Sequence, residues 1–400
     1  MCAAKTKVST SLHKTQGLER LVPTQRNRTL QTPERSPQHP QLTKRLQVAI
    51  VAPSLKWVGG QSAQADLLMR HWKDDPDVEA SFIAVDQEFP AFLSWAENVP
   101  YLRTVLREPL YGLRLYRKLQ NVDIAHVFSA SYWSFLLGPA LAMLIAHMLG
   151  KKVLINYRSG EAADHLERSR LAIRLLTSAD LLVVPSGYLA RVFDGFGLSA
   201  RAVPNVIDTS QFIYRERHPL KPKLICPRGF GPYYQVDLVV RAFRDIQEKF
   251  VDATLSLPGK GSLENNIRRL VRELKLRRVE FPGAVSRDKI GTHYDQADIF
   301  VNASYVDNMP VSILEAFAAG TPVVSTAPEG VRYIVEHERT GLLCEPGDWQ
   351  ALGANVTRLL RDPDFARCLA QNAHEESHRY RWEVIRAQWL EAYQSLILKK

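Results

Sequence analysis

The sequence predicts an α/β fold built from two doubly wound domains, and three observations carry this prediction. From residue 46 onward, short runs rich in Val, Ile and Leu alternate with longer amphipathic stretches, as in a parallel sheet covered by helices on both faces. Both halves open alike, because residues 48–51 and residues 223–226 each lead to a pair of glycines and then a helix. The chain has 400 residues, which is too long for one compact core and long enough for two.

Eight runs are predicted to be strands, and helical stretches separate nearly all of them. Ligands of open α/β sheets bind outside the carboxyl ends of the strands, so two such domains facing one another place the active site in the cleft between them. The predicted strands are residues 46–52, 124–128, 152–157, 181–185, 223–226, 253–257, 299–302 and 322–325.

The chain divides into four predicted parts. Residues 1–45 contain nine Lys or Arg, two Glu and no aromatic residue, so they cannot bury enough apolar surface to order themselves. We expect a disordered basic tail that lacks the apolar stretch of a secretory signal. Residues 46–215 form the first domain and residues 216–378 the second. Residues 379–400 form a helix with a wide apolar stripe, which we expect to pack back on the first domain.

Composition excludes several classes of protein. Most of the net charge of +10 comes from the tail, so the nearly balanced body does not indicate a nucleic-acid partner. The four cysteines form no Cys-x-x-Cys pair, which suits the reducing cytosol and predicts no structural metal. The longest apolar run, residues 135–149, is shorter than the roughly 20 residues that a bilayer crossing needs. We therefore expect it to be a buried helix.

The strongest candidate site lies where the predicted strand 299–302 leads through a loop to Pro310 and a helix over residues 311–319. Proline suits the first helical position, and the free N–H groups there can bind a diphosphate. Glu315 lies among apolar neighbours and needs a partner. A ribose offers hydroxyls to Glu315, and a hexose offers hydroxyls to Asp307. The alternative is that Asp307 only interacts with the helix N-terminus and Glu315 with a neighbouring backbone or cation.

These residues resemble a known family, the retaining glycosyltransferases of the GT-B fold (glycosyltransferase family 4, glycosyl transferases group 1). The hallmark of that family is two acids separated by seven residues, which is the spacing of Asp307 and Glu315. The resemblance runs from about residue 46 to the C-terminus. Other segments that resemble the family are Gly59-Gly60, residues 204–208, residues 258–261, residues 281–283 and residues 319–324.

The resemblance implies two Rossmann-like domains that face a central cleft, the first binding the acceptor and the second the nucleotide sugar. It implies that Glu315 binds the donor ribose and Asp307 the donor hexose. The other donor contacts that it implies are Gly59, Gly60, Gly259, Gly261, Asn308, Met309 and Pro310.

The chain departs from the family pattern at charged positions. Arg228 matches an Arg that the family directs at the diphosphate, so Arg228 and Asp307 are the catalytic candidates. The family's next cation, a Lys, falls near Tyr234, whose hydroxyl carries no positive charge. A glycine of the family's donor loop is also replaced, and Arg332 is added nearby. Our hypothesis is that Arg332 supplies the missing charge.

Candidates for the acceptor side come from the first half. Arg158, Glu161 and His165 belong to a polar loop after a predicted strand, and Arg158 aligns with a His that relatives place near the reacting sugar. A charged helix start is the alternative for this loop. His126 is the fourth candidate, and its alternative is a core histidine with satisfied hydrogen bonds.

The function implied is transfer of a hexose from a UDP- or GDP-linked sugar to an acceptor hydroxyl, with retention of anomeric configuration. It needs no protein nucleophile, no divalent metal and no cofactor besides the nucleotide sugar as co-substrate. We expect a glycan or lipid-linked acceptor, as in cell-surface glycan or glycolipid synthesis, and a cytoplasmic protein. A peripheral contact with the inner face of the membrane stays open. A helical face interrupted by Pro109 carries four basic residues, Arg103, Arg107, Arg114 and Lys118. We interpret this basic face as solvated.

Of three rival interpretations, the first stays open. A degenerate GT-B protein could bind nucleotide or glycan without transfer, as the Tyr at the Lys position suggests. A Rossmann dehydrogenase would need a complete glycine fingerprint, which the sequence lacks. The two Asp-x-Asp motifs, at residues 75–77 and 362–364, would suggest metal-bound sugar nucleotides in another fold, but their polar surroundings predict solvated turns.

Overall fold

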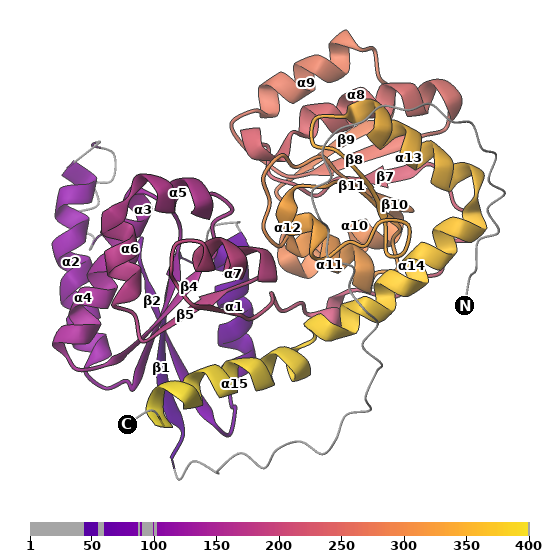
Figure 1. Cartoon of the computed structure of the whole chain (residues 1–400). Coiled ribbons are helices and arrows are strands. Elements are labelled where there is room, and N and C mark those ends of the chain that lie inside the picture. Colours follow the sequence, from indigo (N-terminus) through magenta and orange to yellow (C-terminus); the bar gives the residue numbers. More distant parts are fainter. Residues whose placement is uncertain (1–43, 55–59, 87–88, 90–98, 100–101, 399–400) are drawn as a thin grey trace, which may run out of the picture. The chain divides into compact units, whose positions relative to one another are not determined.

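The computed structural model describes residues 44–54, 60–86, 89, 99 and 102–398 of the chain, and everything from Arg45 onward groups into one compact unit. The strands of these residues form two six-stranded parallel sheets, which confirms the α/β class and the two doubly wound halves (Figure 1). The first sheet runs, in spatial order, β2 (Val78–Ala84), β1 (Leu46–Ala52), β3 (Ile124–Ser129), β4 (Lys152–Tyr157), β5 (Leu181–Val184) and β6 (Ala200–Ala202). The second runs β12 (Leu342–Cys344), β11 (Val323–Thr326), β10 (Ile299–Asn302), β7 (Lys223–Ile225), β8 (Thr254–Pro258) and β9 (Val279–Gly283).

The eight predicted strands are the inner strands of the two sheets, and the four that sequence patterning missed are the edge strands β2, β6, β9 and β12. Inner strands are buried on both faces, so they read as continuous apolar runs. Edge strands are partly exposed: β9 has no fully buried residue, whereas every residue of β10 is buried. The missing apolar signal at the edges follows from this difference in burial.

Helices connect the strands in both halves. Those of the first half are α1 (Gly60–Trp72), α2 (Leu102–Leu119), α3 (Trp133–Phe135), α4 (Leu141–Met148), α5 (Ala162–Arg168), α6 (Arg170–Thr177) and α7 (Gly187–Asp194). Those that follow are α8 (Val236–Lys249), α9 (Glu264–Glu273), α10 (Arg287–Gln296), α11 (Val311–Ala318), α12 (Glu329–Arg332), α13 (Trp349–Arg361), α14 (Pro363–Ser377) and α15 (Trp382–Leu398).

The prolines differ in detail from the sequence predictions. Pro310 lies just before the first residue of α11, with an extended ψ of 115°, so it caps this helix instead of occupying its first position. Pro109 lies inside α2, which continues across it. A π-helical turn over Leu136–Ala140 joins α3 to α4 and accommodates Pro139.

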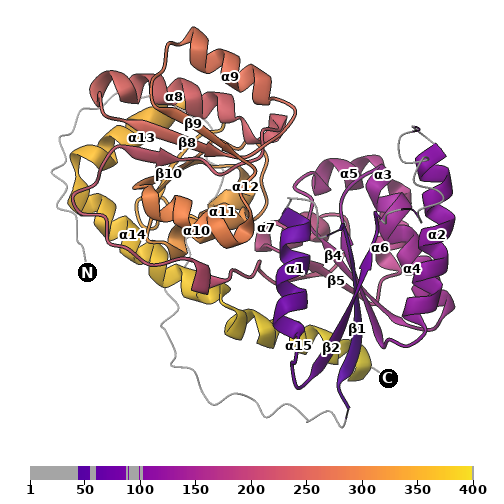
Figure 2. The ribbon, with the colours of Figure 1, turned by 180° about the vertical axis from the view of Figure 1, so that it is seen from behind.

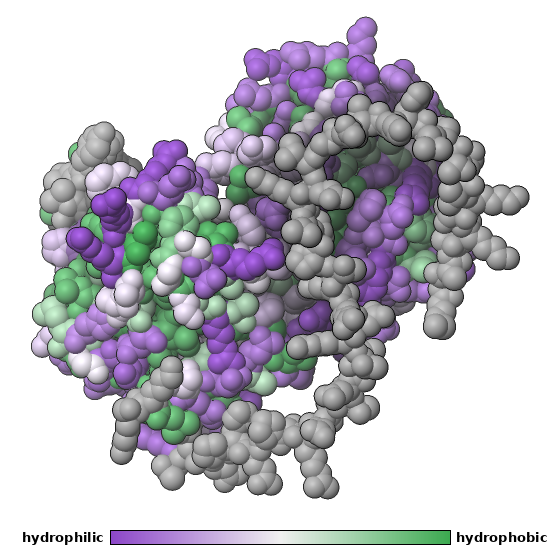
Figure 3. Space-filling model, viewed as in Figure 1, coloured by the Kyte–Doolittle hydropathy of each residue, from purple (hydrophilic) through white to green (hydrophobic). Residues whose placement is uncertain are grey.

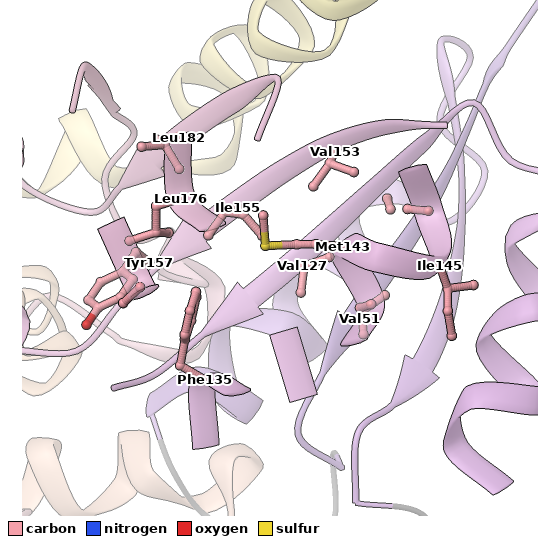
Figure 4. Packing of buried hydrophobic residues seen from close by; sticks show 14 of the residues in the cluster. Val51, Val127, Phe135, Met143, Ile145, Val153, Ile155, Tyr157, Leu176 and Leu182 are labelled. Atoms are coloured by element: carbon pink, nitrogen blue, oxygen red, sulfur yellow. The ribbon is translucent and has the colours of Figure 1, made fainter. Parts of the chain in front are cut away.

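The core of the first half lies between the sheet and the helices on one of its faces. Val127 of β3 and Ile155 of β4 pack with Phe135 and Met143, whose side chains point toward the strands (Figure 4). The run 135–149 is thus a helix, as expected, but only one side of it is buried: Leu144 is 57% exposed and Met148 71%. No helix in the described part of the chain is long and apolar enough to span a bilayer.

The C-terminal helix α15 packs against elements of the first half. Its Trp389 ring lies 4.7 Å from the ring of His126 in β3. Arg386 donates to both carboxylate oxygens of Asp75, at 2.7 and 3.0 Å. The prediction of a solvated turn is therefore wrong for Asp75, which is 93% buried by this ion pair and its surroundings. Although burial acts to raise it, Arg386 holds the pKa of Asp75 below its ordinary value.

Candidate functional site

A cavity of about 980 Å³ is lined by loops that follow the carboxyl ends of strands in both sheets, where open α/β sheets bind ligands. Its described lining includes charged residues of both signs, so it is built for a polar ligand. The cations are Arg70, Arg158, Arg228, Lys260 and Arg287, and the acids are Asp66, Glu161, Asp208, Asp288, Asp307 and Glu315.

Arg228 and Asp307, the two catalytic candidates, form an ion pair inside this cavity. Their side chains are only 10% and 13% exposed. Arg228 also donates to Ser312 Oγ at 3.0 Å, at the start of α11. Burial is the largest influence and acts to lower the pKa of Arg228, but the Asp307 carboxylate, together with Tyr234, Cys226 and Tyr294, raises the pKa above its ordinary value. The guanidinium is therefore a permanent cation at the N-terminus of α11.

Tyr234, at the position of the family's Lys, supports Arg228 instead of adding a charge. The Arg228 guanidinium lies 4.3 Å from the centroid of the Tyr234 ring, in a cation–π contact. This contact orients the guanidinium. It brings no second cation to the cavity.

Glu315 finds its partner in Tyr294 of α10, whose hydroxyl donates to the carboxylate at 2.9 Å. The expectation of a partnered carboxylate is met, although by a residue that the sequence did not single out. Burial raises the pKa of Glu315, while the Tyr294 hydrogen bond and the charges of Arg287 and Arg228 act in the opposite direction. The carboxylate still lines the cavity, where it can accept hydrogen bonds from a ligand.

The raised pKa predicts how Glu315→Gln changes stability with pH. The folded protein binds this proton more tightly than the unfolded chain, so the folded state loses stability as the pH rises through the raised pKa. At about pH 7.5 the Gln variant should therefore be more stable than wild type, because it removes the buried charge. Near the ordinary pKa of a Glu this gain should vanish. Denaturant unfolding at both pH values measures it.

A matched variant fixes the sign of this effect. Glu338 is mostly exposed, and its hydrogen bond to Arg358 lowers its pKa. Glu338→Gln should therefore slightly destabilise the protein near neutral pH. If Glu315→Gln behaved like Glu338→Gln, the buried charge of Glu315 would not be a cost to folding.

Two glycines let the cavity loops approach one another. A Cβ on Gly259 would lie 2.0 Å from the carbonyl oxygen of Arg228, and one on Gly330 would lie 2.2 Å from the carbonyl oxygen of Asn308. Neither distance is sterically allowed, so these positions require glycine. Gly259 lines the cavity and at the same time fixes the loop that carries Arg228.

The loop from Asn308 to Pro310 lines the cavity and is held by side chains of the first half. Ser186 donates to the Asn308 side-chain oxygen, and Asn205 Nδ2 donates to the Met309 carbonyl at 2.7 Å. Asn308 Nδ2 is buried without a hydrogen-bond partner among the described residues. Such a donor is available to a ligand.

On the first half, Arg158 and Glu161 line the cavity together with Gly60. The Arg158 guanidinium donates to Asn205 and lies 5.3 Å from the centroid of the Phe128 ring. Burial lowers the pKa of Arg158 to about 9, so it remains charged near neutral pH. Glu161 accepts a hydrogen bond from the Tyr233 hydroxyl at 2.7 Å.

Both histidine candidates lie in the core and do not line this cavity. The two nitrogens of His126 contact the Tyr393 hydroxyl at 2.8 Å and the Asn156 amide at 3.0 Å. Burial, with the nearby charge of Arg158, lowers the pKa of His126 to about 3, so the ring is neutral. His165 Nδ1 contacts the Tyr157 hydroxyl at 2.8 Å. The alternative of a satisfied core histidine therefore holds for His126.

Three residues predicted on the donor side are not among the described residues that line the cavity. Arg332 lies outside the cavity lining and pairs with Glu345 at 2.6 Å, so the structure does not support it as the missing cation. Gly261 packs against the Phe230 backbone and does not line the cavity. Gly59 lies outside the described residues.

Sequence reasoning missed Lys260, Tyr294, Arg287 and the acid Asp66. Arg287 at the start of α10 pairs with Asp66 of α1 at 3.3 Å, and Arg70 shares that carboxylate at 3.0 Å. Lys260 lies between Gly259 and Gly261, and the sequence prediction named only these two glycines as donor contacts. No group of three or more metal-ligating side chains occurs in the part of the chain that the structure describes.

Two successive doubly wound halves, with a charged cavity at the carboxyl ends of their strands, define the GT-B class of proteins. Sucrose-phosphate synthase (tll1590) from Thermosynechococcus elongatus superposes with a TM-score of 0.70 and 22% identity, covering 89% of this chain and 100% of that one. Anabaena Alr3699/HepE in complex with UDP-glucose superposes with a TM-score of 0.70 and 18% identity, covering 88% and 100%. These likenesses show the fold.

Residues 211–376 match the family described as Glycosyl transferases group 1. The GDP-mannose-dependent alpha-(1-6)-phosphatidylinositol monomannoside mannosyltransferase of Mycolicibacterium smegmatis is 26% identical, over 70% of this chain and 79% of that protein. The chain spans only 21% of another relative, the exopolysaccharide phosphotransferase SCO2592 of Streptomyces coelicolor, at 29% identity. Residues 211–376 therefore carry a Glycosyl transferases group 1 domain, which favours an enzyme over the binding-only alternative.

Proposed function

We propose that the chain is a glycosyltransferase that moves a hexose from a UDP- or GDP-linked sugar to an acceptor hydroxyl, with retention and without a divalent metal. One observation carries the proposal. Arg228, the Asp307–Pro310 loop at the start of α11, and Glu315 line a single cavity, with a cation and a helix N-terminus beside two acids. That combination suits a diphosphate between two polyhydroxyl groups.

The descriptions of two similar proteins support the choice of donor. The Anabaena protein of the same fold has been solved with UDP-glucose, and the mycobacterial relative is named as GDP-mannose-dependent. Glu315 would accept hydrogen bonds from the ribose and Asp307 from the hexose, in agreement with the residue spacing of the family.

The chemical step requires the enzyme to stabilise negative charge on the departing diphosphate. Arg228 and the N-terminus of α11 would do this. Two buried donors, Arg228 Nε and Asn308 Nδ2, have no partner among the described residues and are available to phosphate or sugar oxygens. The acceptor hydroxyl would enter on the side of Arg158 and Glu161, on the same face of the sugar as the leaving group.

The charge that the family places at Tyr234 would come from Lys260. Lys260 is exposed, lines the cavity and forms no ion pair with any described residue. Its carbonyl accepts from the Phe230 amide at 3.0 Å, so its backbone lies next to the loop of Arg228. Because Asp307 already neutralises Arg228, an unpaired Lys260 is the cation most available to a diphosphate.

Removing the Lys260 charge, and then restoring a cation at position 234, tests whether Lys260 contacts the diphosphate. Lys260→Ala should lower kcat/KM for transfer about tenfold, as loss of one charge-assisted hydrogen bond would. Adding Tyr234→Lys to that variant should recover most of the loss, because it returns a cation to the same diphosphate. Lys249→Ala, which removes an exposed lysine outside the cavity lining, is the matched control. A Lys260→Ala enzyme with the wild-type rate would contradict the assignment.

The proposed function itself is tested by incubating the purified protein with UDP- and GDP-sugars. We expect binding by calorimetry and slow nucleotide release, accelerated by a suitable glycan or lipid-linked acceptor. Chelation of divalent metals should leave the rate unchanged. Retention is read from the anomeric configuration of the product by NMR. Neither binding nor release with any donor would contradict the proposal.

A further inference from the structure

The first half carries a helical layer whose outer surface is unusually apolar. The strand order β2-β1-β3-β4-β5-β6 and right-handed crossovers place α2, α4 and α6 on the same face of the sheet. Both views of the ribbon show α4 between α2 and α6 (Figures 1 and 2). The inner sides of α4 and α6 bury residues in one core cluster, so their other sides face outward.

A stripe of large apolar side chains runs along the outside of the α3–α4 segment. Trp133 is 76% exposed, Leu137 39%, Leu144 57% and Met148 71%. The spacings of four, seven and four residues keep these side chains on one side of a helix. Leu171 on α6 is 53% exposed. We call these five residues the apolar outer face; Figure 3 shows hydrophobic residues gathered among polar ones over α4 and α6.

Basic side chains flank this face with few acids. The helices α2 and α6 and the α3–α4 segment together contain seven Arg or Lys and a single Glu. Arg114 and Arg117 of α2, and Arg170 and Arg174 of α6, are exposed and form no ion pair within the described residues. The α3–α4 segment itself has no Asp, Glu, Lys or Arg.

We propose that the apolar outer face and its flanking arginines bind an anionic membrane surface. Exposed Trp, Leu and Met can enter the boundary between headgroups and acyl chains, while cations beside them contact anionic headgroups. A second copy of the chain fits less well, because a symmetric contact would bring like charges together. The basic face of α2, interpreted from the sequence as solvated, belongs to this surface, since Pro109 does not interrupt the helix.

Vesicle co-sedimentation tests the proposal without any nucleotide or acceptor, so its outcome is independent of sugar transfer. The full chain should bind phosphatidylcholine vesicles that contain about one third phosphatidylglycerol, bind pure phosphatidylcholine much more weakly, and be released by salt. Arg114→Glu with Arg174→Glu should weaken binding at least about tenfold. Leu144→Ser with Met148→Ser should also weaken it.

Matched controls come from the second half. Val251 is 76% exposed, so Val251→Ser removes a comparable apolar side chain, and Arg272→Glu on α9 reverses a comparable charge. Both should bind vesicles like wild type, and all variants should keep the wild-type affinity for nucleotide. Absence of vesicle binding, or face variants that bind like wild type, would overturn the proposal. So would a wild-type dimer that the face variants dissociate, because the face would then join two copies.

Discussion

Replacing Arg228 with Ala is expected to reduce kcat/KM for sugar transfer by about two to three orders of magnitude, as loss of one preorganised charge-stabilising group does. The guanidinium would no longer oppose the charge that develops on the leaving diphosphate. The same change should also destabilise the fold by roughly 3–5 kcal/mol, because it leaves Asp307, which is only 13% exposed, without its ion-pair partner. Steady-state kinetics and denaturant unfolding measure the two effects separately.

A second substitution separates catalysis from folding. Arg228→Ala combined with Asp307→Asn removes both charges of the buried pair, so most of the lost stability should return. Transfer should remain impaired, since no cation has been restored beside the diphosphate. A double variant that regained the wild-type rate would show that Arg228 acts only by holding Asp307.

Replacing Glu315 with Ala is expected to weaken nucleotide binding about a hundredfold. Two hydroxyl hydrogen bonds to one carboxylate would be lost, each contributing about 1.5 kcal/mol or more. Calorimetry with UDP and with GDP measures the loss and also indicates which nucleotide the protein prefers. Unchanged affinity for both would refute the assignment of Glu315 to the ribose.

Tyr294→Phe is the informative control for this result. It removes the hydroxyl that donates to Glu315 at 2.9 Å but leaves the carboxylate in the cavity. If Glu315 contacts the ribose directly, Tyr294→Phe should cost much less affinity than Glu315→Ala. Equal losses from the two variants would mean that Glu315 serves mainly to hold Tyr294, whose hydroxyl oxygen also lies 2.8 Å from the Ser312 carbonyl oxygen in α11.

The tertiary structure corrected the site predictions mainly at charged and aromatic residues. Arg332 and Lys260 are both cations near glycines in the sequence, yet Arg332 pairs with Glu345 and only Lys260 lines the cavity. His126 lies within a predicted strand, where a histidine can belong either to a functional site or to the core. Its hydrogen bond to Tyr393, 267 residues away, reveals that the ring belongs to the core.

By itself, the sequence determined the α/β class, the inner strands of both sheets, and the junction at Pro310 where loop becomes helix. These features depend on local patterns of apolar residues and on the backbone of proline and glycine, which are readable along the chain. Only the tertiary structure decided that Arg228 meets Asp307, that Tyr294 holds Glu315, and which side of the 133–148 helix is exposed. Such contacts depend on how distant segments pack. In a helix that is apolar on all sides, the sequence does not show which side the rest of the fold will bury.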